Sequence, residues 1–215
     1  MDGRSKDFGS RSPSTEVLVP GIGRPYVDGD SLDLSVPLAF TVPDVLTAGD
    51  CRMLIDMLEK EGFDEAPIST IAGEVMRKDV RNNRRVMFDH EDLAARLYQR
   101  IEHALPIVCN TKPVAANERF RAYKYEPGQR FAPHFDGCFK RNAHERSELT
   151  FMVYLNDGFG GGATRFLDYE VEVTPRTGMA LLFQHRVLHE GCEVTSGIKY
   201  VLRSDIMYRD TPATA

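Results

Sequence analysis

The sequence lacks any apolar run long enough to cross a membrane, and residues 1–14 are polar, without the apolar core of a signal peptide. A cytoplasmic protein without a membrane partner is therefore expected. The chain also lacks an excess of positive charge, because its net charge is -5 at pH 7, which argues against a nucleic-acid partner. Its four cysteines lack the paired spacing of a zinc or redox motif and are expected to be reduced thiols: Cys51, Cys109, Cys138 and Cys192.

The length and composition indicate one globular domain. The chain has 215 residues, of which 42% are hydrophobic, so it is long enough to bury a full core. Residues 1–16 are rich in Asp, Gly, Arg, Ser and Pro without periodicity, and they are predicted to form a disordered tail. Residues 17–215 are then expected to form a single domain.

Two amphipathic helices are predicted in the first half of the chain. Apolar residues recur at helical spacing over residues 51–62, where Thr47 and Asp50 form a candidate capping box. A second helix is predicted from His90 to Leu105, with Asp89 as its N-cap. Neither helix carries obvious chemistry, so both are expected to support a sheet.

Short alternating runs separated by Gly, Pro, Asn and Asp predict β-strands in the second half of the chain. These strands are expected near Arg119–Tyr125, Leu149–Leu155, Ala163–Leu167, Glu170–Val173, Met179–Phe183 and Tyr200–Met207, after a short one at Leu38–Val42. Helices followed by strands predict a mainly β fold with supporting helices. We expect a double-stranded β-helix, the jelly-roll of cupin-like proteins, with the helices against one outer face.

Two histidines and one aspartate form a candidate metal site. His134 and Asp136 are separated by one residue, and on an extended strand such residues point to the same side. His189 is a third candidate ligand from much later in the chain. Two imidazoles and one carboxylate suit one face of an octahedral Fe(II) ion and leave positions open for a co-substrate and O2. Lys199 begins an alternating run, and its charge suits the far carboxylate of a dicarboxylate that chelates the iron.

Together these residues resemble the 2-oxoglutarate and Fe(II)-dependent dioxygenases, and most of all the prolyl 4-hydroxylase branch. The matching phrases are Tyr125-Glu-Pro-Gly-Gln-Arg-Phe-Ala-Pro-His-Phe-Asp, Tyr154-Leu-Asn, Gly161-Gly162-Ala-Thr164, His189-Glu-Gly and Gly197-Ile-Lys199. The resemblance implies Fe(II) on His134, Asp136 and His189. It also implies 2-oxoglutarate contacts from Tyr125, Tyr154, Thr164 and Lys199, with O2 as co-substrate and ascorbate as a candidate reductant. The expected reaction hydroxylates an unactivated C–H of a prolyl residue in a peptide or protein.

Several residues are candidates for the substrate side of the site: Arg81, Arg84, Arg121, Tyr123, Arg146 and Arg203. Segment 77–85 contains five cations, and it is interpreted either as a solvated loop or as a lid over the substrate. Strand alternation places Arg203 and Asp205 on the same face as Lys199. An ion pair between Arg203 and Asp205 is favoured over a contact of Arg203 with substrate, and Tyr123 is equally well explained as a satisfied core residue.

Two alternative functions stay open. The first is hydroxylation of a free amino acid or an amino-acid-derived small molecule. The carboxylate of such a substrate would be bound by arginines, for which the candidates are Arg81, Arg84, Arg121 and Arg146. Two of these arginines converging near the metal would favour that substrate. The second is a non-catalytic metal-binding or oxygen-sensing module, which would bind metal without forming succinate. The oligomeric state is not predicted.

The glycine run at residues 158–162 is expected to form a tight turn, since it lacks the Lys-Ser/Thr of a phosphate-binding loop. His185 and His189 are four residues apart, as in some zinc hydrolases. The glutamate of that motif is missing between them, so a zinc hydrolase is not favoured.

Overall fold

The computed structural model describes residues 14–70 and 73–210. The predicted tail, residues 1–16, lies almost wholly outside this range, and its last residue, Glu16, begins the first strand. The helices are α1 (Ala48–Glu61) and α2 (Glu91–Ile101). The strands are β1 (Glu16–Val19), β2 (Ala39–Val42), β3 (Asp64–Glu65), β4 (Ile68–Thr70), β5 (Gly73–Val75), β6 (Arg84–Asp89), β7 (Thr111–Ala116), β8 (Arg119–Tyr125), β9 (Phe131–His134), β10 (Glu145–Tyr154), β11 (Gly160–Gly161), β12 (Thr164–Phe166), β13 (Val171–Val173), β14 (Ala180–Gln184), β15 (His189–Gly191), β16 (Val194–Ser196) and β17 (Lys199–Asp210).

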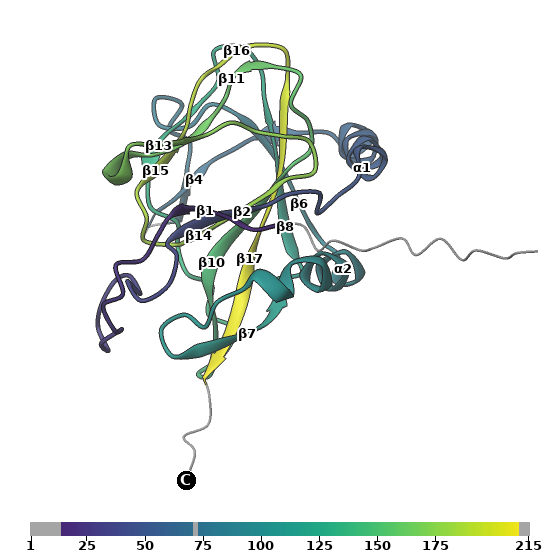
Figure 1. Cartoon of the computed structure of the whole chain (residues 1–215). Helices are drawn as coiled ribbons and strands as arrows, with labels where there is room; N and C mark the ends of the chain where they lie inside the picture. The colour runs from purple at the N-terminus through teal and green to yellow at the C-terminus, as the bar shows by residue number, and fades with distance from the viewer. Residues whose placement is uncertain (1–13, 71–72, 211–215) are drawn as a thin grey trace, which may run out of the picture.

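Two antiparallel sheets form the core of the molecule (Figure 1). The larger has the order β1-β2-β14-β10-β17-β8-β6-β3, with β7 also paired to β17. The smaller has the order β13-β12-β15-β9. Several neighbouring strands are far apart in the sequence, such as β2 and β14 or β8 and β17, as in a jelly-roll. The predicted double-stranded β-helix is confirmed.

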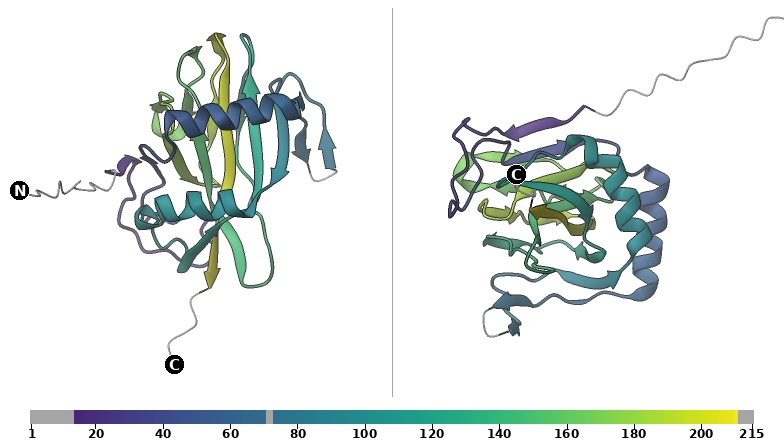
Figure 2. Two further views of the ribbon diagram at one scale, coloured as in Figure 1. Left: turned by 90° about the vertical axis from the view of Figure 1, so that its right-hand side faces the viewer. Right: turned by 90° about the horizontal axis from the view of Figure 1, so that it is seen from below.

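Both helices lie across the outer face of the larger sheet (Figure 2). Thr47 and Asp50 form the predicted capping box at the start of α1, and Gly62 ends the helix with a positive φ of 85°. The predicted N-cap of α2 was wrong. His90 takes this place, accepting a hydrogen bond from the Leu93 N–H, because Asp89 is the last residue of β6. The helix also ends at Ile101, where a short 3-10 turn follows instead of the predicted extension.

The central strand β17 has two different faces. Tyr200, Leu202 and Ile206 pack in a core cluster with Leu58 of α1 and Leu97 of α2. The alternate residues line a cavity between the two sheets: Lys199, Val201, Arg203 and Asp205. The predicted alternation along this strand is confirmed, and it separates an apolar layer under the helices from a polar interior.

Strands β6, β7 and β9 are among those that were not predicted from the sequence. Arg84 and Arg85 open β6, so a run of charge hides the strand. Pro113 interrupts β7, and Pro133 interrupts β9, and proline within a run counts against a strand. β10 and β17 also extend beyond their predicted ends, because their outer parts pair with each other and with β7.

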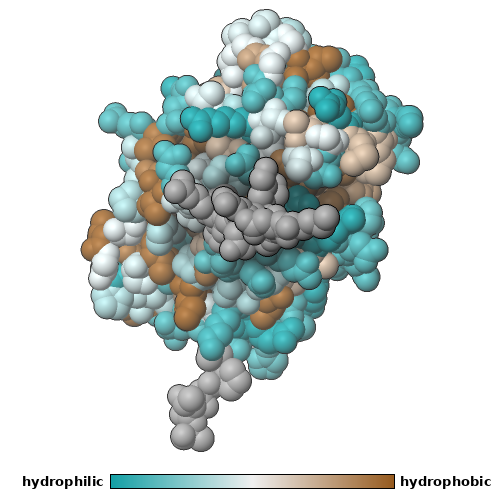
Figure 3. Space-filling model, turned by 45° about the vertical axis from the view of Figure 1, so that its right-hand side comes forward, coloured by the Kyte–Doolittle hydropathy of each residue, from teal (hydrophilic) through white to brown (hydrophobic). Residues whose placement is uncertain are grey.

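None of the described helices is long and apolar enough to cross a membrane. The helical side of the molecule mixes hydrophilic and hydrophobic side chains in small areas where grey atoms do not cover it (Figure 3). The polar interior, rather than this surface, is therefore the feature that calls for a functional explanation.

Leu97→Ala tests the packing of α2 on the sheet. The Leu97 side chain is only 1% exposed, so its truncation leaves a cavity and is expected to lower the free energy of unfolding by about 2–5 kcal/mol. Met53→Ala on α1 is the matched control, because Met53 is 65% exposed and its truncation should change stability by less than about 0.5 kcal/mol. Urea denaturation measures both, and similar effects of the two substitutions would contradict the packing described here.

Candidate metal and co-substrate site

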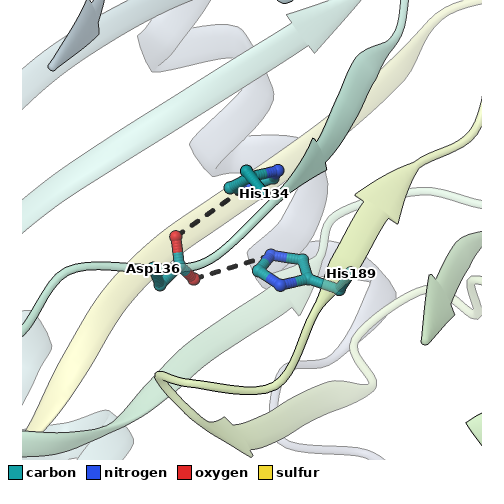
Figure 4. A group of neighbouring side chains, drawn as sticks. All are labelled: His134, Asp136 and His189. Atoms are coloured by element: carbon teal, nitrogen blue, oxygen red, sulfur yellow. Dashed lines mark ion pairs between the residues drawn. The ribbon is translucent and has the colours of Figure 1, made fainter. Parts of the chain in front are cut away.

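The three candidate metal ligands converge from neighbouring strands (Figure 4). His134 ends β9, His189 begins β15, and the two residues are direct cross-strand partners. Asp136 follows two residues after His134, where its N–H donates to the His185 carbonyl at 3.0 Å. One ligand atom from each of the three residues lies within 4.8 Å of the others. This spacing allows all three to reach a single ion.

Backbone carbonyls hold both imidazoles in one orientation. The Nδ1 of His134 lies 2.9 Å from the Ala132 carbonyl, and the Nδ1 of His189 lies 3.0 Å from the Val187 carbonyl. A proton on each Nδ1 therefore leaves the Nε2 lone pair free. The two Nε2 atoms lie 3.8 and 3.7 Å from the two carboxylate oxygens of Asp136. Each histidine thus presents a metal-binding nitrogen to the same space.

The charge states of the three residues also suit a metal ion. Burial lowers the pKa of His134 to about 3 and also lowers the pKa of His189, so both rings are neutral at pH 7. Burial by itself would raise the pKa of Asp136, but the Arg203 guanidinium and the two histidines hold it well below its usual range. Two neutral imidazoles with one ionised carboxylate are a donor set that fits Fe(II).

A buried chain of polar groups orients Asp136. The Thr150 hydroxyl donates to Asp136 Oδ2 at 2.6 Å and lies 3.0 Å from Nδ1 of His185. The Nε2 of His185 in turn lies 2.8 Å from the Ser147 hydroxyl. Burial lowers the pKa of His185, so this histidine is a neutral link in the chain. The polar chain fixes the carboxylate before any ligand binds.

Arg203 pairs with two carboxylates at once. Its Nη2 lies 3.2 Å from Asp136 Oδ2 and 3.2 Å from Asp205 Oδ1. The expected ion pair between Arg203 and Asp205 is confirmed. The additional contact with Asp136 shows that this arginine also compensates the charge of the candidate metal ligand.

Lys199 is a buried cation without a carboxylate partner among the described residues. Its side chain is 3% exposed, and its Nζ donates to the Gly162 carbonyl at 2.6 Å. The rings of Tyr125 and Tyr154 lie 5.2 and 5.5 Å from Nζ. Burial lowers the pKa of Lys199 to about 8. A carboxylate bound here would compensate the buried charge.

The turn before β12 shapes this lysine pocket. Gly162 has a φ of 66°, and a Cβ at this position would lie 3.2 Å from Cδ of Lys199. The glycine run was predicted as a tight turn, but Gly160–Gly161 form the short strand β11, and the positive φ of Gly161 and Gly162 favours glycine there. The hydroxyls of Tyr154 and Thr164 lie 2.7 Å apart, and Thr164 lines the same cavity as Lys199. One ammonium with neighbouring hydroxyl groups is a donor set that fits the far carboxylate of 2-oxoglutarate.

The candidate metal ligands and Lys199 line one cavity of about 730 Å³. Four of the predicted substrate residues also line it: Arg81, Arg121, Tyr123 and Arg203. Arg84 and Arg146 do not. Arg84 is exposed at the start of β6, and Arg146 pairs with Glu148 at 2.5 Å on the surface. Arg85, the next residue of β6, lines the cavity instead of Arg84.

Segment 77–85 lies against the strand that carries His134. The Ala132 N–H donates to the Val80 carbonyl at 2.8 Å, and the Arg130 N–H donates to the Asn82 side chain at 2.8 Å. Arg81 is buried under this contact, so the segment is more than a solvated loop. Its role as a lid stays a prediction.

Aromatic rings flank the two histidines. The ring of Phe131 stacks on His134 with centroids 3.6 Å apart, and the ring of Phe183 meets His189 edge-on at 4.5 Å. Neither these rings nor the roles of Thr150 and His185 were predicted from the sequence. No local signal marks them, because their contacts join segments that are distant in the chain.

A jelly-roll with two histidines and one carboxylate between its sheets defines a class of mononuclear iron proteins. The comparisons specify this class further, since residues 120–204 match the model of the 2OG-Fe(II) oxygenase superfamily. The part of the chain that carries the candidate metal ligands and Lys199 is therefore similar to this superfamily, and the chain resembles its prolyl 4-hydroxylase-like branch.

Two curated relatives are prolyl 4-hydroxylases. Prolyl 4-hydroxylase 1 of Arabidopsis thaliana is 24% identical over 189 residues, which are 76% of this chain and 66% of the relative. The prolyl 4-hydroxylase subunit alpha-2 of Gallus gallus is 28% identical over 129 residues, which are 53% of this chain and 23% of the relative. The chain therefore matches only part of the length of each.

Two solved structures support the fold. The crystal structure of a Pseudomonas putida prolyl-4-hydroxylase superposes with a TM-score of 0.58 at 19% identity, covering 81% of this chain and 93% of the other. A viral collagen prolyl hydroxylase from Paramecium Bursaria Chlorella virus-1, solved as a 2OG complex, has a TM-score of 0.53 at 20% identity and covers 80% and 96%. Both likenesses concern the arrangement of the strands.

Thr150→Val tests the support of Asp136. The substitution keeps the shape of the side chain but removes the hydroxyl that donates to the carboxylate. We expect the affinity for Fe(II), measured by anaerobic titration, to fall roughly 10- to 100-fold. Thr150→Ser restores the donor and should bind Fe(II) nearly as tightly as the unchanged protein. Equal affinities for the Val and Ser variants would show that the hydroxyl does not support the metal ligand.

Proposed function

We propose that this protein is an Fe(II)- and 2-oxoglutarate-dependent dioxygenase that hydroxylates a prolyl residue in a peptide or protein. The observation that carries the proposal is the single cavity shared by His134, Asp136, His189 and the buried Lys199. A metal site of this kind occurs in many classes of protein. The buried ammonium group of Lys199 in the same cavity favours an anionic co-substrate, because it needs a negative partner. Residues 17–215 would act as one domain, and a cytoplasmic location stays a prediction.

The protein contributes a preset metal site to the reaction. His134 and His189 would donate their Nε2 lone pairs, and Asp136 would donate a carboxylate oxygen. When bound, iron and 2-oxoglutarate together supply the activation of O2, by which 2-oxoglutarate becomes succinate and CO2 while the substrate C–H becomes C–OH. His134, Asp136 and His189 would together hold the ion, and the cavity that they line would take the reactants.

The protein also fixes the direction of the co-substrate. Lys199 would pair with the far carboxylate of 2-oxoglutarate, and Tyr154 and Thr164 would supply hydroxyl groups beside it. Tyr125 is the cross-strand partner of Lys199 and walls the same end of the cavity. The keto-acid end of the co-substrate would then face His134, Asp136 and His189.

The mouth of the cavity suits a peptide. Phe135 and Phe139 line the cavity and are 52% and 40% exposed, so they offer apolar area to an extended chain. Segment 77–85 forms another wall of the mouth through its contacts with β9. Arg81 and Arg121 both line the cavity with the candidate metal ligands, which is the convergence that would favour a free amino acid or small molecule. The similarity to prolyl hydroxylases favours a peptide over that substrate. The buried Lys199 in the same cavity disfavours a non-catalytic metal-binding module.

Peptide turnover tests the proposed function. Incubation of the Fe(II)-loaded protein with 2-oxoglutarate, O2 and a library of prolyl peptides should yield succinate and hydroxyproline in equal amounts. His189→Ala should abolish both products, because it removes a metal ligand. Arg146→Gln, outside the cavity, should retain both. Bound iron and 2-oxoglutarate without succinate from any peptide would contradict the prolyl hydroxylase proposal.

The pH dependence of 2-oxoglutarate binding tests the role of Lys199. Its pKa is about 8 without a bound anion, and a carboxylate partner would raise it, so binding above pH 8 must take up a proton. We expect the Kd to be flat below pH 8 and to rise about tenfold per pH unit above it. Calorimetry with Mn(II) in place of Fe(II), in buffers of different ionisation enthalpy, measures both the Kd and the proton uptake.

Two substitutions serve as references for this titration. Lys199→Arg keeps a permanent charge and should bind 2-oxoglutarate without proton uptake. Lys199→Met should weaken binding roughly 10- to 100-fold at pH 7 and remove the pH dependence. Unchanged proton uptake in the Met variant would mean that another group binds the far carboxylate.

A further inference from the structure

The cavity carries more positive charge than its two expected ligands need. Its lining contains six cations, Arg81, Arg85, Arg121, Arg186, Lys199 and Arg203, and only two carboxylates, Asp136 and Asp205. The two charges of Fe(II) and the two opposite charges of 2-oxoglutarate cancel. The protein as a whole has a net charge of -5, so this positive excess is local. It remains after both ligands bind, and it favours a further anion.

Two of these cations, Arg121 and Arg203, lie towards the end of the cavity opposite to Lys199. Lys199 and Arg203 are four residues apart on the same face of β17, which corresponds to roughly 13 Å along the strand. Arg121 of β8 is the cross-strand partner of Arg203. If Lys199 holds the far carboxylate of 2-oxoglutarate, the arginines at the other end lie beyond the metal ligands and on the side of the substrate.

Three of the guanidinium groups that line the cavity have unused hydrogen-bond donors. Within residues 14–70 and 73–210, three buried nitrogens lack an acceptor: Nη2 of Arg81, Nη1 of Arg121 and Nε of Arg203. The Nη1 of Arg121 lies 3.6 Å from Asp205 Oδ2, beyond hydrogen-bond distance. Buried polar groups normally have partners, so these nitrogens indicate a missing acceptor.

Aromatic rings hold the guanidinium group of Arg81 in place. Arg81 is 5% exposed, and its guanidinium carbon lies 4.4 Å from the ring centre of Tyr123 and 4.5 Å from that of Phe131. Burial would raise the pKa of Tyr123, but Arg81, Arg203 and Arg121 together lower it below its ordinary value. The lowered pKa of the Tyr123 hydroxyl therefore indicates a positive electrostatic potential at this point of the cavity.

We propose that Arg121 and Arg81, supported by Arg203, form a carboxylate-binding subsite, so that the preferred substrate carries a carboxylate beside its prolyl residue. This inference rests on the proposed function, because it names the class of peptide that the same site takes. Guanidinium groups match the planar carboxylate with two N–H donors. The carboxylate comes either from an Asp or Glu next to the proline or from the end of a chain that terminates in proline.

Matched peptides distinguish these sources and test the subsite. The probes are N-acetylated peptides with a single proline, in which a neighbouring Asp replaces Asn, or a free C-terminal carboxylate replaces an amide. With the Fe(II)-loaded enzyme and 2-oxoglutarate, we expect kcat/KM for one of the carboxylate peptides to exceed that of its neutral partner roughly 10- to 100-fold. Whichever pair shows the preference identifies the source of the carboxylate.

Substitutions connect the preference to the arginine. Arg121→Gln should bring the ratio for the matched pair close to one, whereas Arg121→Lys should keep part of it because it keeps the charge. Arg119→Gln is the matched control, since Arg119 lies on the same strand but pairs with Asp89 outside the cavity, and it should leave the ratio unchanged. Because the readout is a ratio within one variant, a general loss of stability does not mimic it.

Anaerobic binding of fluorescent versions of the same peptides separates this inference from the proposed function. Turnover of neutral and carboxylate peptides with equal kcat/KM would overturn the subsite and leave prolyl hydroxylation standing. Absence of turnover, with a carboxylate preference in binding that Arg121→Gln removes, would support the subsite and contradict the proposed reaction. Absence of any preference in both turnover and binding would overturn the subsite.

Discussion

The structure depends on the pairing of β17 between β10 and β8. This strand has one face under the helices and one face in the cavity, so every second residue meets an entirely different environment. A shift of the register by one residue would place Lys199 under α1 and turn Tyr200 into the cavity. The apolar layer under the helices therefore fixes the positions of the polar groups inside. In the smaller sheet, the pairing of His134 with His189 has the same effect on the metal ligands.

The charges inside the cavity depend on each other. Asp136 is buried, and an unpaired buried carboxylate would take up a proton and lose its use as a metal ligand. Arg203 and Thr150 prevent this by pairing with the same carboxylate. A cation bound at Asp136 shares this carboxylate with Arg203, and Asp205 then remains as the second partner of the arginine. The pair of carboxylates would keep the buried charge of Arg203 compensated both with and without a metal ion.

Much of this arrangement could be predicted from the sequence. The spacing of His134 and Asp136 and the alternation after Lys199 are local patterns, and a strand of period 2 translates them directly into directions in space. The ends of α1 follow from capping residues that act within one turn. The residues around the co-substrate pocket could also be predicted from the sequence, since Gly162 and Thr164 belong to one short motif.

Other parts depend on contacts that no local pattern encodes. Asp89 has the side chain of a good N-cap, but its place at the end of β6 and its pairing with Arg119 take it out of this role. Thr150 and His185 meet only because β10 and β14 are neighbours in the sheet. Arg84 and Arg85 are equivalent in the sequence, and only the pairing of β6 with β8 decides which of them enters the cavity.

The two ends of the cavity differ in a way that keeps two anions apart. Lys199 stands without a carboxylate partner among the described residues, so a carboxylate bound there meets a full positive charge. At the other end, Asp205 already compensates part of the charge of Arg121 and Arg203. The electrostatic attraction left for a dicarboxylate is therefore weaker there, and the remaining positive charge suits a single carboxylate on an otherwise neutral peptide. In the proposed carboxylate subsite, Asp205 would repel a dicarboxylate more than a single carboxylate on an otherwise neutral peptide, and it would thereby disfavour a second molecule of 2-oxoglutarate.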